Sequence, residues 1–229
     1  RMTPAVVLEA LGHPAWVLRY LRTGGIPMMR NWMPYAPDGA NAAQVADMYG
    51  TLTPAPMVNW EHLRRIRDTW KGPLVIKGLL HPDDAREAVR LGANALVISN
   101  HGGRQLDVAP SPLEMLPAIH AAVGDQVELL LDSGVRRGSD VVIARCLGAR
   151  ACIFGRPSLY AVAAAGQAGV ARVLQLMRNE IDMVLAQMGC NEFDGLNSDY
   201  LWNRDTPLPP AASSTCENSV RPFVRTESV

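Results

Sequence analysis

The second half of the chain alternates short apolar runs with amphipathic segments. Four runs of strand length are continuously apolar, which is typical of parallel strands buried on both faces. They are residues 74–76, 95–98, 128–131 and 151–154. Helical patterns separate the runs, and a glycine follows or closes each pattern, as is common where a helix ends. These patterns cover residues 83–91, 113–123 and 139–147. The alternation predicts a parallel sheet and an α/β fold.

Further patterns flank this alternation on both sides. Residues 158–165 and 170–188 predict two more helices, and Asn59 can cap another helix that precedes the first strand. Residues 1–58 hold seven prolines and no sustained period, so we expect an irregular insert there. Residues 204–229 are rich in Pro, Ser and Thr and predict a disordered or surface-draped tail.

Composition and charge exclude several classes of protein. The chain has 229 residues, 48% of them apolar, and its 22 basic side chains are balanced by 22 acidic ones. It therefore lacks the basic excess of a nucleic-acid-binding protein. Its apolar runs are far shorter than the roughly 18 residues of a membrane-spanning helix. The four cysteines have no C-x-x-C spacing, so we expect neither a metal site nor a disulfide framework, and we place the protein in the cytoplasm.

Reactive residue types gather where the four apolar runs end. They are Lys77, Ser99 with His101, Asp132, and Gly155 with Arg156. An open doubly wound sheet and a closed (β/α)₈ barrel both fit the order of elements, but a barrel concentrates its chemistry just past the carboxyl ends of many strands. We therefore predict that residues 59–203 form half of a TIM-type barrel. Because four units make only half a barrel, and the chain opens with Arg1 and no signal-peptide pattern, we expect a fragment.

The turn after the second run combines a base with a cation. Two glycines separate His101 from Arg104, and they allow a tight turn and close approach of a ligand. Imidazole suits general-base catalysis near neutral pH, and guanidinium suits two-pronged binding of a carboxylate. The alternative interpretation is an ordinary glycine turn with two exposed polar side chains.

The turns after the third and fourth runs suit an anion. Glycines and the side chains of Arg136 and Arg156 lie where predicted helices begin, and backbone N–H groups at such places bind phosphate. Ordinary turn and cap chemistry would give the same pattern. Lys77 is one of only two lysines. Three roles are open to Lys77. It forms a Schiff base, it places a fixed positive charge beside an electron-accepting ring, or it simply extends into solvent.

These motifs, in this order, resemble one enzyme family. The segments are VIKG at residues 75–78, SNHGGRQLD at 99–107, DSGVRRG at 132–138 and GR at 155–156. Residues 74–190 are similar to the C-terminal half of the FMN-dependent (S)-2-hydroxy acid oxidases and dehydrogenases, and the flanking segments resemble the mandelate dehydrogenase branch most. The resemblance implies a (β/α)₈ barrel that binds FMN at its C-terminal face, with this chain supplying strands five to eight.

The resemblance also implies a role for each matched residue. His101 would be the catalytic base, Arg104 would bind the substrate carboxylate, and Lys77 would lie beside N1 and the C2 oxygen of the flavin. Ser99 would contact the flavin as well. The phosphate end would be formed by Asp132, Ser133, Gly134, Val135, Arg136, Gly155 and Arg156. The family's other flavin and substrate contacts belong to its first four strands, which have no counterpart here.

The functional prediction is therefore FMN-dependent oxidation of an (S)-2-hydroxy acid, such as mandelate, lactate or glycolate, to the 2-keto acid. A phosphate-binding aldolase that uses Lys77 and a non-catalytic half-barrel module are the alternatives. The electron acceptor is not indicated, and a homo-oligomer is expected. Residues 2–50 occupy the place of the insert by which mandelate dehydrogenases contact the membrane. We expect either a peripheral contact at the inner face of the membrane or a lid or oligomer contact.

Overall fold

The computed structural model of the chain describes residues 3–22, 25, 27–52 and 58–202. They divide into two compact units, one within residues 1–63 and one within residues 64–229. The tail predicted at residues 204–229, with Cys216, lies outside the described residues.

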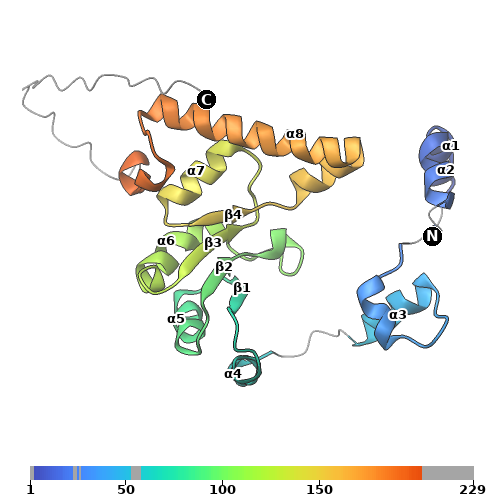
Figure 1. Cartoon of the computed structure of the whole chain (residues 1–229), viewed down its shortest axis with the longest axis horizontal. Helices are drawn as coiled ribbons and strands as arrows, with labels where there is room; N and C mark the ends of the chain where they lie inside the picture. The colour runs from blue at the N-terminus through green and yellow to red at the C-terminus, as the bar shows by residue number, and fades with distance from the viewer. Residues whose placement is uncertain (1–2, 23–24, 26, 53–57, 203–229) are drawn as a thin grey trace, which may run out of the picture. The chain divides into compact units, whose positions relative to one another are not determined.

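The larger unit is built on a parallel sheet of four strands (Figure 1). The strands are β1 (Val75–Leu79), β2 (Ala95–Ile98), β3 (Glu128–Asp132) and β4 (Ala151–Ile153), and they lie side by side in sequence order. The helices that connect them are α5 (Pro82–Arg90), α6 (Pro112–Val123) and α7 (Gly138–Cys146). This arrangement confirms the alternation of parallel strands and helices predicted from the apolar runs.

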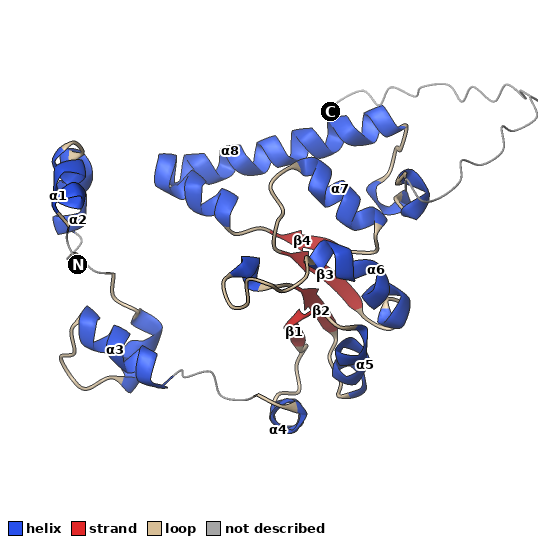
Figure 2. Ribbon diagram, turned by 180° about the vertical axis from the view of Figure 1, so that it is seen from behind, coloured by secondary structure: helices blue, strands red, loops and turns tan. Residues whose placement is uncertain are grey.

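The two faces of the sheet differ in burial. Leu96, Ile98, Leu129 and Leu131 alternate with the residues of the other face and are buried, and helices α5, α6 and α7 lie along this side of the sheet (Figure 2). On the other face, side chains of the edge strands β1 and β4 are exposed. Burial on both faces is therefore incomplete in β1 and β4 within this four-stranded sheet.

The helices at the ends of the sheet follow the predicted boundaries closely. Helix α4 (Trp60–Thr69) begins after Asn59, whose Oδ1 accepts the backbone N–H of His62 at 3.1 Å. Helix α8 (Arg156–Met188) covers both helices predicted after β4, and its backbone is non-helical at Ala165 and Gly166. The break between two helical segments is therefore confirmed.

A short C-terminal segment packs against α7 and α8. It contains the 3₁₀ turns η3 (Phe193–Gly195) and η4 (Ser198–Tyr200), and its Cys190 joins Cys146 in an apolar cluster. Cys146, Cys152 and Cys190 are free thiols, and burial raises the pKa of Cys152 to about 11. A thiol in such surroundings is a packing residue rather than a nucleophile.

The smaller unit is mostly helical, which corrects the irregular texture expected for residues 1–58. Its elements are α1 (Pro4–Leu11), α2 (Pro14–Arg22), the 3₁₀ helix η1 (Arg30–Tyr35) and α3 (Ala42–Leu52). Pro4 and Pro14 each stand at the first residue of a helix, where proline is compatible with the fold because its missing N–H is not needed. Among the described helices, none combines the length and apolar character needed to cross a membrane.

Candidate active site

Three polar side chains meet at the carboxyl edge of the sheet, one from each of three neighbouring strands. The Nζ of Lys77 lies 2.9 Å from the Oγ of Ser99 and 2.7 Å from the Oδ2 of Asp132. The Ser99 hydroxyl donates to the same Asp132 oxygen at 2.5 Å. The structure therefore brings together three residues that the sequence placed at the ends of separate strands. Asp132, which the resemblance assigns to the phosphate end, has its side chain on Lys77 and Ser99 instead.

The surroundings of Asp132 favour its ionised form. The Ser99 side chain is inaccessible to solvent, while the side chains of Asp132 and Lys77 are 16% and 41% exposed. Burial opposes ionisation of Asp132, but the hydrogen bonds from Lys77 and Ser99 and the charge of Lys77 outweigh it, so the pKa of Asp132 is lower than usual. Asp132 is thus a carboxylate at neutral pH that holds the Lys77 ammonium in one place.

Two residues beside the cluster have a backbone conformation that L-amino acids rarely adopt. His101 has a φ of 57° and Ser133 a φ of 83°, and they follow β2 and β3. The two turns are joined, because the Oγ of Ser133 accepts the Gly102 N–H at 3.0 Å. Within the first turn, Ser99 Oγ accepts the His101 N–H at 3.1 Å. Such conformations cluster at functional sites, where the surrounding structure compensates for their strain.

Gly78 is a site residue that the sequence analysis did not single out. The pairing of β1 with β2 shifts register between Lys77 and Leu79, and Gly78 has a φ of 104°. A β-carbon at Gly78 would lie 2.8 Å from Cε1 of His101, so the imidazole lies directly on the glycine backbone. The available signal was a glycine inside a strand, which often marks a bulge or a close approach.

Arg104 lies at the end of the turn that begins with His101. The 3₁₀ turn η2 (His101–Gly103) follows β2, and Arg104 caps it by donating its N–H to the His101 carbonyl at 3.4 Å. Both side chains are exposed. The predicted base and the predicted carboxylate-binding cation thus share one short turn with solvent access.

The two turns predicted to bind an anion, at the starts of α7 and α8, differ in whether their backbone N–H groups are already hydrogen-bonded to side chains. At the start of α7 the N–H groups of Arg136 and Arg137 both donate to Oδ2 of Asp140, at 2.8 and 2.9 Å. At the start of α8 the N-cap residue is Gly155, and within the described part of the chain no side chain caps the first N–H groups of this helix. Because the α7 donors are already used, the start of α8 is the better anion site of the two.

Open space lies in front of the glycines of both turns. A β-carbon at Gly134 or Gly155 would meet no atom within 4 Å. The Nη2 of Arg156 lies 3.5 Å from the Gly102 carbonyl, which brings the α8 turn close to the turn of His101. Val135, in contrast, is buried, so its side chain is not available to a ligand.

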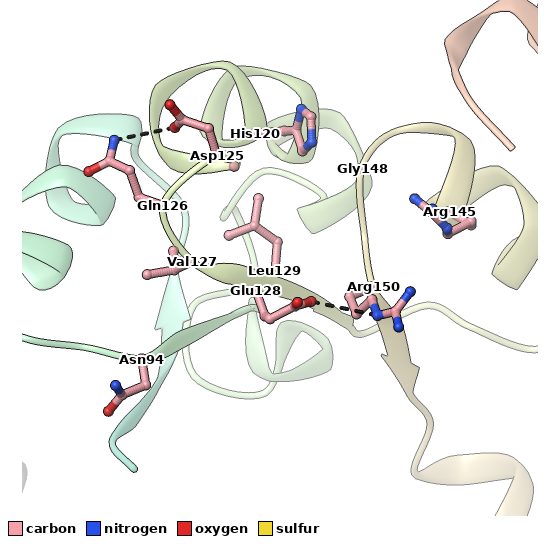
Figure 3. A pocket seen from close by; sticks show the side chains of 11 residues that line it. Asn94, His120, Asp125, Gln126, Val127, Glu128, Leu129, Arg145, Gly148 and Arg150 are labelled. Carbon is pink, nitrogen blue, oxygen red and sulfur yellow. Dashed lines mark hydrogen bonds and ion pairs between the residues drawn. The ribbon is translucent and has the colours of Figure 1, made fainter. Parts of the chain in front are cut away.

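A separate hollow lies at the opposite end of the strands (Figure 3). It has a volume of about 380 Å³, and its lining includes Asn94, His120, Glu128 and Arg150. Arg150 is engaged with protein carboxylates, because it lies 2.8 Å from Asp194 and 3.8 Å from Glu128. The hollow contains no predicted site residue, and this end of a barrel usually serves stability rather than catalysis.

Comparison with known proteins agrees with this geometry. The family model for FMN-dependent dehydrogenases matches residues 1–203. The chain belongs to the FMN-dependent dehydrogenase family. It is similar to the (S)-mandelate dehydrogenase of Pseudomonas putida, with 43% identity over 201 residues, or 86% of this chain and 49% of that protein.

Other relatives carry different names at nearly the same identity. The pre-mycofactocin synthase of Mycolicibacterium smegmatis is 42% identical over 213 residues, covering 90% of this chain and 53% of that protein. The L-lactate dehydrogenase of Azorhizobium caulinodans is 43% identical over 197 residues, covering 85% of this chain and 51% of that protein. The chain spans about half the length of the curated relatives that it matches.

A solved structure gives the same result. The crystal structure of the monotopic membrane protein (S)-mandelate dehydrogenase matches 89% of this chain with a TM-score of 0.82 and 42% identity. The match covers 53% of that protein's chain. The sheet β1–β4 with its helices is therefore the C-terminal half of a TIM-type barrel, as predicted, and FMN is the cofactor of the family.

Proposed function

We propose that the complete protein uses FMN to oxidise an (S)-2-hydroxy acid to the 2-keto acid. The observation that carries the proposal is the imidazole of His101 held against Gly78, with Arg104 on the same turn. The charge of Lys77 lies on the neighbouring strand β1. A base, a carboxylate-binding cation and a fixed positive charge are the groups that this oxidation requires.

The residues of this edge fit the two ends of FMN. At the phosphate end, a dianion would be held by the side chains of Arg136 and Arg156 and by the uncapped start of α8. The open turns at Gly134 and Gly155 would give it space. Ser133 belongs to the same turn as Gly134. At the ring end, Lys77 and Ser99 would provide a cation and a hydroxyl. We assign these residues to the cofactor on the chemistry of their donors.

The chain's own residues would then divide the reaction among them. FMN, when bound, supplies the acceptor for the two electrons that leave the substrate carbon. The guanidinium of Arg104 binds the substrate carboxylate with two parallel hydrogen bonds and orients the hydroxyl-bearing carbon. The imidazole of His101 takes a proton from that hydroxyl or from Cα. Ser99 and Asp132 hold the Lys77 ammonium so that negative charge on the flavin ring meets a positive neighbour.

The structure disfavours an aldolase that uses Lys77 as a Schiff base. Such chemistry requires a neutral amine that can attack a carbonyl carbon. Here the Lys77 nitrogen donates to Ser99 and lies 2.7 Å from the Asp132 carboxylate, so its hydrogens and its charge are engaged by these two side chains. A non-catalytic module would not explain the positive φ of His101 either, because strain of this kind is typical of functional sites.

The substrate within the 2-hydroxy acid class is left to experiment, because relatives of different name are almost equally similar. The test is to purify the protein in its full natural length and record its visible spectrum. The flavin band should bleach when (S)-mandelate, (S)-lactate or glycolate is added without oxygen. A colourless protein, or a yellow one that no 2-hydroxy acid bleaches, would contradict the proposal.

We further propose a peripheral membrane contact through α1 and α2. Leu8, Leu11, Trp16 and Leu21 are exposed on these helices, and interfacial helices carry apolar and aromatic side chains of this kind. The solved relative is a monotopic membrane protein. Replacing Leu8 and Leu11 by Asp should move activity from the membrane fraction to the supernatant of a detergent-free lysate. Wild-type activity found wholly in the supernatant would favour a lid or an oligomer contact. The expected homo-oligomer stays a prediction.

A further inference from the structure

The turn between β3 and α7 is held at its far end by a side chain from another helix. Glu180 of α8 accepts the Gly138 N–H through Oε2 at 2.7 Å. Its other oxygen, Oε1, accepts from Nε of Arg137 at 2.8 Å and lies 2.8 Å from Nη2 of the same residue. One carboxylate therefore binds two consecutive residues at the start of α7.

The packing around Gly138 makes this contact close and specific. A β-carbon at Gly138 would lie 2.6 Å from Cβ of Glu180 and 2.6 Å from the backbone nitrogen of Ile181. The start of α7 thus rests directly on the backbone of α8, and only glycine fits there. The Glu180 side chain is 29% exposed. The bonds from Arg137 and Gly138 hold its pKa below the usual value, so it is a carboxylate at neutral pH.

Helix α8 takes part in both proposed phosphate turns. Its first segment begins at Arg156, beside the open turn of Gly155. Its second segment, which follows the non-helical residues Ala165 and Gly166, bears Glu180, which fixes the end of the turn that carries Gly134 and Arg136. With Asp140 bound to the amides of Arg136 and Arg137, three consecutive N–H groups at the start of α7 are occupied by protein carboxylates. These groups shape the turn and do not themselves bind an anion.

We propose that Glu180 is a positioning residue for the phosphate end of the cofactor site. By holding the start of α7 it sets the position of the Gly134 turn and of Arg136, and so one side of the space that a phosphate must fill. This inference rests on the proposed function, since it takes the two turns as the phosphate site. It assigns Glu180 no contact with the cofactor.

The experiment compares FMN with riboflavin, which has the same ring and no phosphate. Flavin-stripped protein of full natural length is titrated with each flavin, and fluorescence quenching gives the dissociation constants. Glu180→Ala should weaken FMN binding by about tenfold or more, because it leaves the Gly138 N–H and Arg137 without their partner. Riboflavin binding should stay within about twofold of wild type, since the ring end is not affected. At saturating FMN, kcat should be unchanged.

Further variants keep the proposal testable if Glu180→Ala does not fold. Glu180→Gln retains an oxygen for the Gly138 N–H but loses the charge. Arg137→Ala removes only the bond between the two side chains. Both variants should lose less FMN affinity than Glu180→Ala does, and neither should lose riboflavin affinity. Glu87→Ala is the matched control. Glu87 is 26% exposed and bonded to Arg90 of its own helix α5, away from both turns. It should leave both affinities unchanged.

The outcomes separate this proposal from the proposed function. Equal loss of FMN and riboflavin in the Glu180 variants would show a general structural role and overturn the positioning role. Wild-type FMN affinity in all of them would overturn it as well. If the wild-type protein binds neither flavin, the proposed function itself fails, whatever the variants show.

Discussion

Gly78→Ala is the most informative single substitution near the proposed base. Gly78 has a φ of 104°, so an alanine there is strained by about 1–3 kcal/mol. In addition, its β-carbon would lie 2.8 Å from Cε1 of His101, well inside the contact distance of two carbon atoms, which is about 3.5–4.0 Å. The backbone of Gly78 is part of β1, so the imidazole has to move away.

The two effects can be measured separately with Gly189→Ala as a control. Gly189 ends α8 with a φ of 67°, and a β-carbon there would meet no atom within 4 Å. Its replacement should lower the free energy of unfolding by about 1–2 kcal/mol, from backbone strain alone. Urea titration should therefore show both variants destabilised. Only Gly78→Ala should lower kcat, and by roughly 10²-fold or more, as expected when a general base is displaced.

The proposed role of the contact between Gly78 and His101 is refuted if Gly78→Ala turns over 2-hydroxy acids within a few-fold of wild type while it remains flavin-replete. The imidazole would then not need its place on the glycine backbone. It is equally refuted if Gly189→Ala loses as much kcat, because strain without contact would then explain the effect.

The remaining predictions concern the cluster, the substrate and the phosphate. The pKa of Asp132 is lowered in the folded state, so its stabilisation is complete above about pH 4, the unfolded value, and is lost as pH falls through the folded pKa. Asp132→Asn should therefore flatten the acid limb of stability measured by urea titration between pH 5 and pH 2; an unchanged limb would contradict the ion pair. Arg104→Lys should raise KM strongly in steady-state kinetics, because an ammonium cannot make the two-pronged contact. Replacing Arg136 and Arg156 together by Ala should release flavin on gel filtration, and full retention would argue against the phosphate assignment.

The strands, the main helices and the meeting of the site residues could all be predicted from the sequence. Apolar runs of strand length alternate with helical patterns that end at glycine, and this pattern depends on local residue choice. Because parallel strands carry their carboxyl ends to one edge, Lys77, Ser99 and Asp132 could be expected close together before any contact was known.

Other features depend on contacts that no local pattern encodes. The positive φ of His101 and Ser133 follows from hydrogen bonds between two turns that are far apart in the sequence. The hydrogen bond from the Gly138 N–H to Glu180 joins two helices that precede and follow β4 in the sequence. No local pattern therefore distinguishes Glu180 from an ordinary surface glutamate. The helices of residues 1–58 were missed because proline was weighed as a breaker, whereas Pro4 and Pro14 begin helices.

Single-turnover reduction of the flavin shows whether His101 is the base of an FMN-dependent 2-hydroxy acid oxidation. Wild type and His101→Gln, both of full natural length and flavin-replete, are mixed with (S)-mandelate or (S)-lactate without oxygen, and the flavin absorbance is followed. We expect rapid bleaching in wild type and a rate constant lower by roughly 10²- to 10⁴-fold in His101→Gln, with FMN still bound. A His101→Gln protein that bleaches within a few-fold of the wild-type rate would contradict this expectation.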